Sequence, residues 1–528
     1  MSVHPPPKNS VSSPNGLTAN VRNSTAWGII SSLFQVGTRL VTVPVIIYHL
    51  GLGGYGIWSI IMTAAIYMRF GSVGIKGAFQ KYVAEATGDG NYRRAGQLLS
   101  TGTAGIVILS IVGLIPVIVF SRQLASAAGV PQEFLTDAAR AFSVFGLTML
   151  FANSGAAYEA IVLGGHRIDL TRKASTILTV AEAIAIVALL HFGFGLFAMA
   201  CVMALSELVY LTYCYAAARR VAQQVRVSVR LITRKVMREV LQFAGSYQLL
   251  SVLQLTYGAL VPVVVLRAYG ADAAGIYAVA NRLVQPVTMC NNALLLPILS
   301  SGAMVYATGA SDRLKRLLAQ SFKVTLAMTI APLTLISIFG VYMVQAWTGQ
   351  TDRAFHYAIS LVCLGVLFQT LSQLGLVLYR GAGGAVMDNV REIVRLLAFV
   401  PAAFMSHQFG FKGVLAWMAG AEFVGMLVMF SELRKSRYAF DLKLLLSDAL
   451  RLSAATLGMV AFAAAAAYLI PEPASSMRMA AITRITVAGV AALVAAYPAL
   501  RMTSAITKSE MRSVLQVFRR NSVNLATK

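Results

Sequence analysis

Long apolar segments recur along the whole chain and predict transmembrane helices. Each is about 18–25 residues long, the length that an α-helix needs to cross a hydrocarbon core of about 30 Å. The segments contain glycine and proline at intervals and lack strict alternation, which is typical of helices and not of barrel strands. We predict about fourteen transmembrane helices, near 26–49, 53–74, 99–121, 138–163, 174–192, 195–216, 243–267, 274–299, 320–346, 355–379, 391–409, 412–433, 452–470 and 480–500.

Composition and charge agree with an all-α integral membrane protein. Hydrophobic residues make up 57% of the chain and charged residues only 12%, against roughly 25% charged residues in a soluble domain. The net charge of +24 raises the possibility of nucleic-acid binding, but most basic residues lie in segments that are cytoplasmic if the N-terminus is inside. This positive-inside pattern predicts a multi-pass protein of the inner (plasma) membrane with both termini in the cytoplasm. The expected partners of the basic loops are anionic lipid headgroups, and no nucleic acid.

An internal repeat divides the chain into two lobes. The segment that begins at Trp27 aligns with the segment that begins at Ser246, and identical residues fall in phase. These identities pair Ser32 with Ser251, Gln35 with Gln254, Val45 with Val264, Gly51 with Gly270, Gly56 with Gly275 and Ile57 with Ile276. Six predicted helices separate the two copies, so both enter the membrane in the same direction. Parallel repeats of this kind are a transporter arrangement.

The repeat and the local composition together predict the domain limits. The two lobes have six helices each, and the last two helices have no counterpart in the repeat. The predicted parts are a disordered cytoplasmic leader (1–22), an N-lobe (23–218), a basic cytoplasmic linker (219–242), a C-lobe (243–434), two extra helices (435–503) and a basic cytoplasmic tail (504–528).

Polar residues within the predicted helices are candidates for substrate binding, because a charged residue at mid-bilayer costs about 2.5–3.5 kcal/mol on insertion scales. In the first helix a polar stripe follows helical spacing, and a second stripe lies in the eighth helix. The functional interpretation is a wet cleft in which arginine binds an anionic group; the alternative is that each arginine snorkels or pairs with a glutamate. The candidate substrate-binding residues are Ser32, Gln35 and Arg39, then Gln254 in the second copy, then Asn281, Arg282 and Gln285.

Three carboxylates are candidates for ion coupling. Glu159, Glu182 and Glu207 lie in the fourth, fifth and sixth predicted helices. A buried carboxylate can carry a proton near neutral pH, as an antiporter requires; the alternative is an ion pair with Arg39 or another basic side chain. The four cysteines and six histidines have no metal-ligand spacing, and no catalytic grouping is visible. We expect no metal, no cofactor and no enzymatic activity.

The first lobe resembles the polysaccharide-biosynthesis (Wzx-type) flippases of the multidrug/oligosaccharidyl-lipid/polysaccharide exporter superfamily. The resemblance rests on the turn LGLGGYGIWS at 50–59 and on the following stretch FGSVGIKGAFQKYVAEATGDGNYRRAGQLLSTG at 70–102. It covers about 30–110 well and 245–300 weakly. It implies an alternating-access transporter that flips a polyprenyl-pyrophosphate-linked oligosaccharide for O-antigen, capsule or exopolysaccharide biosynthesis. The expected partners are the polysaccharide polymerase or export machinery. Arg39 and Arg282 fit the family's use of intramembrane cations without matching an aligned motif position.

Two other classes of function stay open at this point. A multidrug or cation antiporter of the same fold would favour acidic residues in its cavity, and this chain has both signs of charge. A membrane enzyme of polysaccharide assembly would need a sizeable loop with catalytic acids, bases or metal ligands. The longest predicted loop is basic and shows no such grouping. A lipid II flippase is a closer variant of the main hypothesis.

Overall fold

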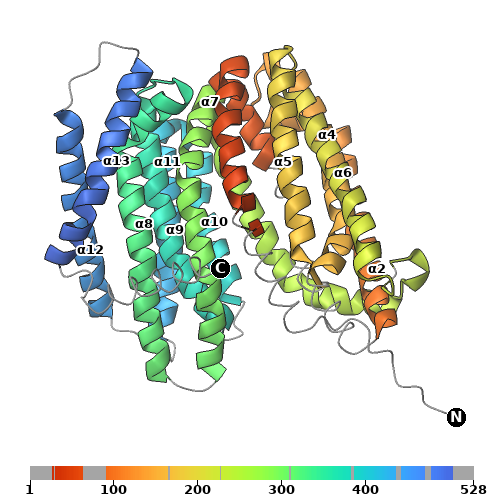
Figure 1. Cartoon of the computed structure of the whole chain (residues 1–528). Coiled ribbons are helices and arrows are strands. Elements are labelled where there is room, and N and C mark those ends of the chain that lie inside the picture. The colour runs from red at the N-terminus through yellow and green to blue at the C-terminus, as the bar shows by residue number, and fades with distance from the viewer. Residues whose placement is uncertain are drawn as a thin grey trace, which may run out of the picture. The chain divides into compact units, whose positions relative to one another are not determined.

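The protein is an all-α molecule in this computed structural model of the 528-residue chain. The structure describes residues 27–28, 30–63, 91–164, 167–225, 227–307, 311–381, 386–435, 442–469 and 477–503. Within these ranges the chain forms α-helices and one 3-10 helix, Val229–Leu231, with no strand (Figure 1). The predicted fold class is therefore confirmed. The predicted leader and basic tail lie outside the described residues, and the domain limits stay predictions.

The chain forms two compact units, Met1–Gly275 and Ile276–Lys528. Unit 1 contains the first helix (Ile30–Thr63), α2 (Tyr92–Val119), α3 (Ser121–Ala127), α4 (Gln132–Gly164), α5 (Ile168–His191), α6 (Leu196–Val221) and the first part of α7 (Arg234–Ala307). Unit 2 contains the remainder of α7, α8 (Ser311–Thr348), α9 (Ala354–Gly381), α10 (Val386–Phe404), α11 (Ser406–Lys435), α12 (Leu442–Tyr468) and α13 (Met477–Met502).

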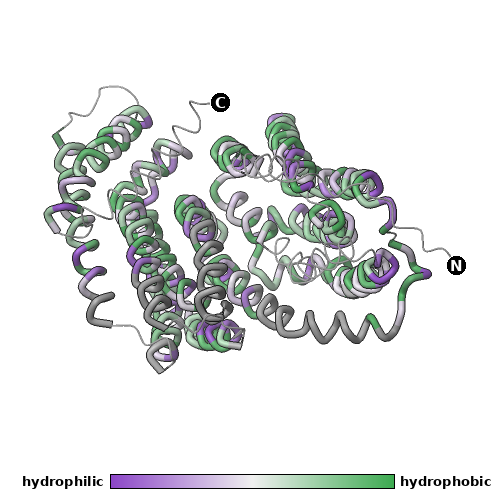
Figure 2. The backbone as a smooth tube through the Cα atoms, turned by 60° about the horizontal axis from the view of Figure 1, so that its bottom comes forward, coloured by the Kyte–Doolittle hydropathy of each residue, from purple (hydrophilic) through white to green (hydrophobic). Residues whose placement is uncertain are grey.

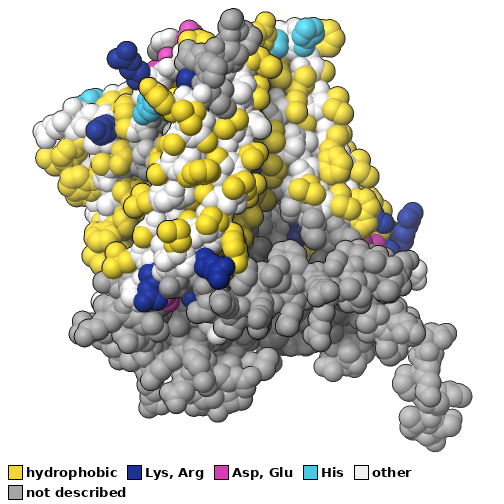
Figure 3. Space-filling model, turned by 60° about the vertical axis from the view of Figure 1, so that its left-hand side comes forward, with side chains coloured by type: hydrophobic (Ala, Val, Ile, Leu, Met, Phe, Trp, Pro, Cys, Tyr) yellow, Lys and Arg dark blue, Asp and Glu magenta, His cyan; other side chains and the backbone are white. Residues whose placement is uncertain are grey.

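The predicted membrane spans correspond to helices of the structure. Among the described residues, 11 helices are long and apolar enough to cross a membrane. Three of these helices carry a glycine with positive φ, namely Gly51, Gly270 and Gly410. The helices with Gly51 and Gly270 each join two predicted spans. The span predicted near 391–409 is α10, whose charged residues lower its mean hydropathy. Hydrophobic residues predominate along the helices in Figure 2, and they cover the middle of the face in Figure 3, where Lys and Arg lie nearer its ends.

Small residues let the helices of unit 1 approach closely. Helix α4 packs against α2 and α6, and Ala157 and Ala160 are fully buried in this contact. Small side chains permit close packing where no hydrophobic effect operates between helices in lipid. A buried polar contact adds to it, because Asn153 Nδ2 donates to Ser110 Oγ at 2.8 Å. Helix α4 thus forms the centre of this unit.

Unit 2 has α9 at its centre, packed against α8 and α11. The two C-terminal helices pack against each other and against α8, and alanines such as Ala463 and Ala488 are buried there beside Phe339. Polar contacts also join α13 to α8, since Arg484 Nη1 donates to the Tyr342 hydroxyl at 3.3 Å. Helices α12 and α13, in the region of the two extra helices predicted at 435–503, therefore form a pair that packs on α8.

Four glycines reproduce the sequence repeat in the backbone. Gly51 and Gly270 both have positive φ, 72° and 85°, a conformation that glycine adopts without the steric cost of a Cβ. One helical turn and a half further on, Gly56 and Gly275 pack against each other's segment inside unit 1. A Cβ on Gly56 would lie 2.5 Å from Gly275 N and 2.6 Å from Ala271 O. The equivalent residues of the two copies therefore share both conformation and environment.

We expect Gly56→Ala to destabilise the protein, because the added methyl group would clash with backbone atoms. Unlike a side chain, the backbone cannot relieve the clash by changing rotamer. Overpacking of this kind typically costs about 1–3 kcal/mol. The measurement is the midpoint of thermal unfolding of the detergent-solubilised protein. Gly113→Ala is the matched control, since a Cβ at Gly113 on α2 would meet no heavy atom within 4 Å. Equal unfolding midpoints for the two variants would contradict the close contact.

Candidate functional site

The polar stripe of the first helix lies partly exposed in unit 1. Arg39 and Gln35 are half-buried, and Ser32 is exposed. The Ser32 hydroxyl donates to Gly28 O at 3.0 Å, and Gln35 O accepts from Thr38 Oγ1 at 3.1 Å. Gln254 on α7 is also half-buried, as its repeat partner Gln35 is. The stripe is thus neither sealed in the core nor fully exposed, which suits a surface that meets a polar ligand.

A second polar surface occupies α7 in unit 2. Arg282 and Gln285 are half-buried, and Arg282 Nη1 donates to Gln285 Oε1 at 3.0 Å. Asn281, also half-buried, donates through Nδ2 to Tyr277 O at 3.2 Å. Gln285 therefore orients the guanidinium along the helix. A guanidinium presents its N–H donors in a planar fork that matches a carboxylate or a phosphate.

The three predicted coupling carboxylates are all half-buried in unit 1. Glu159 on α4 and Glu207 on α6 both lie close enough to the phenol of Tyr210 to act on it electrostatically. Glu182 lies on α5. Two of the three carboxylates therefore lie near Tyr210 on the packed helices α4 and α6.

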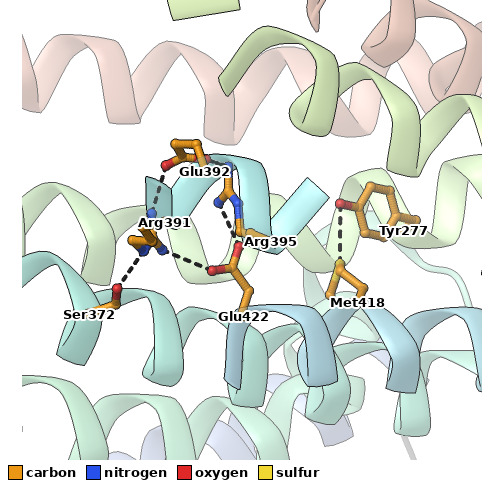
Figure 4. Close-up of polar contacts among 7 residues, drawn as sticks. All are labelled: Tyr277, Ser372, Arg391, Glu392, Arg395, Met418 and Glu422. Carbon is orange, nitrogen blue, oxygen red and sulfur yellow. Dashed lines mark hydrogen bonds and ion pairs between the residues drawn. The ribbon is translucent and has the colours of Figure 1, made fainter. Parts of the chain in front are cut away.

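A buried network of charges in unit 2 is the polar cluster with the densest contacts among those described (Figure 4). Arg391 Nη1 lies 2.7 Å from Glu392 Oε1, and Arg391 Nη2 lies 3.1 Å from Glu422 Oε2. Arg395 Nη1 lies 2.8 Å from the other oxygen of Glu422, and Arg395 also pairs with Glu392. Arg391 Nε donates to Ser372 Oγ. All four charged side chains are at least nine-tenths buried, so each charge depends on its partners for stabilisation.

This network joins three helices. Arg391, Glu392 and Arg395 lie on α10, Ser372 on α9 and Glu422 on α11. Together with the buried Asp388, the α10 residues recur at spacings of 3, 1 and 3 positions, which places them on one face of a helix. Apolar residues such as Ile393 and Leu397 are exposed on the opposite face. Helix α10 is therefore amphipathic with its polar face inward.

Sequence reasoning missed most of this network. The positive-inside argument placed Arg391 and Arg395, at the start of the span predicted near 391–409, among the cytoplasmic basic residues. The inward face of α10 shows that Arg391 and Arg395 are instead buried within unit 2. The signal that was present is the helical spacing of the charged residues. Among the described residues, no group of three His, Cys, Asp or Glu side chains is placed to hold a metal ion.

Solved structures of transporters share this fold. The inward closed conformation of the lipid II flippase MurJ aligns with a TM-score of 0.72 at 14% identity, over 89% of this chain and 98% of that one. An inward-facing multidrug resistance MATE transporter of the MOP superfamily aligns with a TM-score of 0.62 at 15% identity, over 78% of this chain and 95% of that one. A MOP superfamily transporter from Pyrococcus furiosus with a binding pocket of reverse polarity aligns with a TM-score of 0.57 at 14% identity, over 80% of this chain and 95% of that one.

Sequence comparison identifies the family. No curated protein matches the chain. The model of the family described as polysaccharide biosynthesis protein matches residues 21–303, a region that includes the polar stripe of the first helix and that of α7. The match covers more than half of the 528 residues. The chain is therefore a multi-pass membrane protein with the MOP transporter fold, and it belongs to the polysaccharide biosynthesis protein family.

Proposed function

We propose that the protein flips a polyprenyl-pyrophosphate-linked oligosaccharide across the inner membrane for surface polysaccharide biosynthesis. The observation that carries this proposal is the pair of partly exposed polar stripes, each with one arginine, within the region that matches the family. Arg39 in unit 1 and Arg282 in unit 2 are each proposed to bind the pyrophosphate. Ser32, Gln35 and Gln254 in unit 1 and Asn281 and Gln285 in unit 2 are proposed to hydrogen-bond the sugar. The fold shared with a lipid II flippase supports a lipid-linked cargo.

Alternating access supplies the physical route. The sugar and pyrophosphate need a polar path, because transfer of unpaired polar groups into hydrocarbon costs several kcal/mol each. The polyprenyl tail has no such need and stays in lipid. Partner polymerases or export machinery would receive the flipped product. No step requires a covalent change, so the proposed activity is transport and not catalysis.

Deletion of the gene tests this function. We expect surface glycan to disappear and its lipid-linked precursor to accumulate at the cytoplasmic face, measured by glycan staining of cells and mass spectrometry of extracted lipids. Re-expression of the protein from a plasmid is the control and should restore the glycan. Normal surface glycan with no accumulated precursor in the deletion strain would reject the proposal.

The proposed orientation places both termini in the cytoplasm. The distribution of Lys and Arg around the apolar segments supports it. A reporter that is active only in the periplasm should give no signal when fused after Lys528, whereas the same reporter inserted in the turn at Gly193 should be active. A strong signal from the C-terminal fusion would reverse the topology.

A MATE-like cation antiporter is the second candidate. The observation that favours it is the site where Glu159 and Glu207 lie near Tyr210, together with the fold shared with MATE transporters. An antiporter of cationic drugs predicts that the deletion strain becomes sensitive to such drugs while its surface glycan is unchanged. The same strain therefore separates the two candidates.

A further inference from the structure

A long apolar groove runs between the first helix and α5 of unit 1, the neighbouring red and yellow helices of Figure 1. Its volume is about 1020 Å³. Large hydrophobic side chains on its rim are well exposed, among them Leu33 at 66% and Ile184 at 65%. The lining residues that matter for the argument are Leu33, Gly37, Val41 and His49 on the first helix and Ala183 and His191 on α5.

The groove is longer than one leaflet of a bilayer. At a rise of 1.5 Å per residue, the lining from Leu33 to His49 spans about 24 Å of the first helix, and the lining from Val180 to Phe192 spans about 18 Å of α5. The hydrocarbon core is about 30 Å thick, so one leaflet contributes about 15 Å. An acyl chain of a phospholipid stays largely within its own leaflet, so a single chain that fills the groove from end to end crosses the bilayer midplane. A polyprenyl chain meets this condition.

Basic and aromatic side chains mark both ends of these two helices. Beyond one end of the groove, Lys173 Nζ on α5 lies 5.2 Å from the ring centroid of Trp27, which precedes the first helix. At the other end, the rings of His49 and His191 lie 6.2 Å apart. Tryptophan prefers the membrane–water interface, and lysine there attracts an anionic phosphate. The arrangement of an apolar groove with a cation at its end complements an anionic lipid with one long tail.

The groove and the polar stripe occupy different faces of the first helix. Neither Gln35 nor Arg39 lines the groove, whereas Gly37 and Val41 do. One helix therefore separates a surface for a polar headgroup from a surface for an apolar tail. Gly37 deepens the groove, because a Cβ at this position would meet no heavy atom within 4 Å.

We propose that this groove is the docking site for the polyprenyl tail of the substrate, with Lys173 next to its pyrophosphate before the headgroup reaches Arg39. This inference rests on the proposed function and extends it, because it assigns tail and headgroup to separate faces of the first helix. Phospholipid acyl chains stay mostly within one leaflet and fill only part of the groove, so they are weak competitors.

Photo-crosslinking tests the docking site directly. The purified full-length protein in lipid nanodiscs is exposed to a long-chain polyprenyl pyrophosphate that carries a diazirine on its tail, and labelled residues are mapped by mass spectrometry. We expect labels on the groove residues of the first helix and α5. Gly37→Leu, which fills the groove, should lower the labelling about tenfold, and Gly113→Leu should not, because Gly113 also faces open space but lies outside the groove.

Two further experiments test whether the headgroup contributes to binding and whether the groove prefers polyprenyl pyrophosphate over phospholipid. Lys173→Gln should weaken labelling by the polyprenyl pyrophosphate and leave labelling by the uncharged polyprenol unchanged. Diazirine-tagged phosphatidylglycerol should label the groove weakly. Equal labelling of wild type and Gly37→Leu, labels that map elsewhere, or stronger labelling by phosphatidylglycerol would overturn the docking site. The binding readout does not depend on transport, so the deletion strain tests the proposed function independently.

Discussion

Arg391→Ala should sharply reduce the amount of folded protein, more than any other single change considered. The guanidinium contacts Ser372, Glu392 and Glu422, and its removal would leave two carboxylates with fewer partners inside unit 2. Breaking a buried ion pair from one side typically costs about 3–5 kcal/mol, which is a large part of the stability of a folded domain. The measurement is the monodisperse fraction of a fluorescently tagged protein on size-exclusion chromatography.

A second variant tests whether the loss of folded protein comes from an uncompensated charge or from the loss of side-chain volume. Arg391→Met combined with Glu422→Gln removes one charge of each sign and keeps similar volumes, and it should recover much of the folded protein. Arg219→Ala is the control for removal of an arginine from an exposed helical position. If Arg391→Ala gave as much folded protein as Arg219→Ala, the network would have no structural role.

The helices themselves follow from the sequence because lipid imposes a single strong rule. Each spanning segment must satisfy its own backbone hydrogen bonds, so segment length and apolarity are sufficient to locate it. The repeat was also visible, since Gly51 and Gly270 are needed for the same positive φ and few residues replace glycine there. These features depend on residues that are close together in the chain, so they can be predicted from the sequence.

The inward face of α10 depends instead on neighbours far along the chain. Arg391 and Arg395 precede an apolar run, and a basic residue in that place normally marks a cytoplasmic helix end. Only the packing of Ser372 on α9 and Glu422 on α11 shows that these arginines are buried. The groove of unit 1 could not be predicted for the same reason. An apolar residue such as Val41 gives the same sequence pattern whether its side chain contacts lipid, another helix or a substrate tail.

The second large expected effect follows from substitution of Arg39, which is half-buried. This cation lies about midway along the membrane-spanning part of the first helix, where a charge is costly unless water or an anion compensates it. If the compensation is the pyrophosphate of the substrate, Arg39→Ala should abolish surface glycan while the protein remains in the membrane. Arg39→Lys should restore transport only in part, because an ammonium lacks the bidentate fork of a guanidinium. Surface glycan and membrane protein level are measured on the same cells.

A structural role for Arg39 predicts a different pattern in the same mutants. If Arg39 were the partner of Glu159, Glu182 or Glu207, Arg39→Ala would strand a carboxylate in the membrane and lower the protein level. Adding the glutamine variant of that glutamate would then restore the level, whereas it cannot restore binding of a pyrophosphate. Arg39→Ala alone therefore distinguishes the two roles: a loss of surface glycan indicates substrate binding, and a loss of membrane protein indicates a structural role. The double variants identify the glutamate partner. Normal glycan export by a well-expressed Arg39→Ala protein would remove Arg39 from the substrate site, and the cation of α7, Arg282, would remain as the candidate to bind the pyrophosphate.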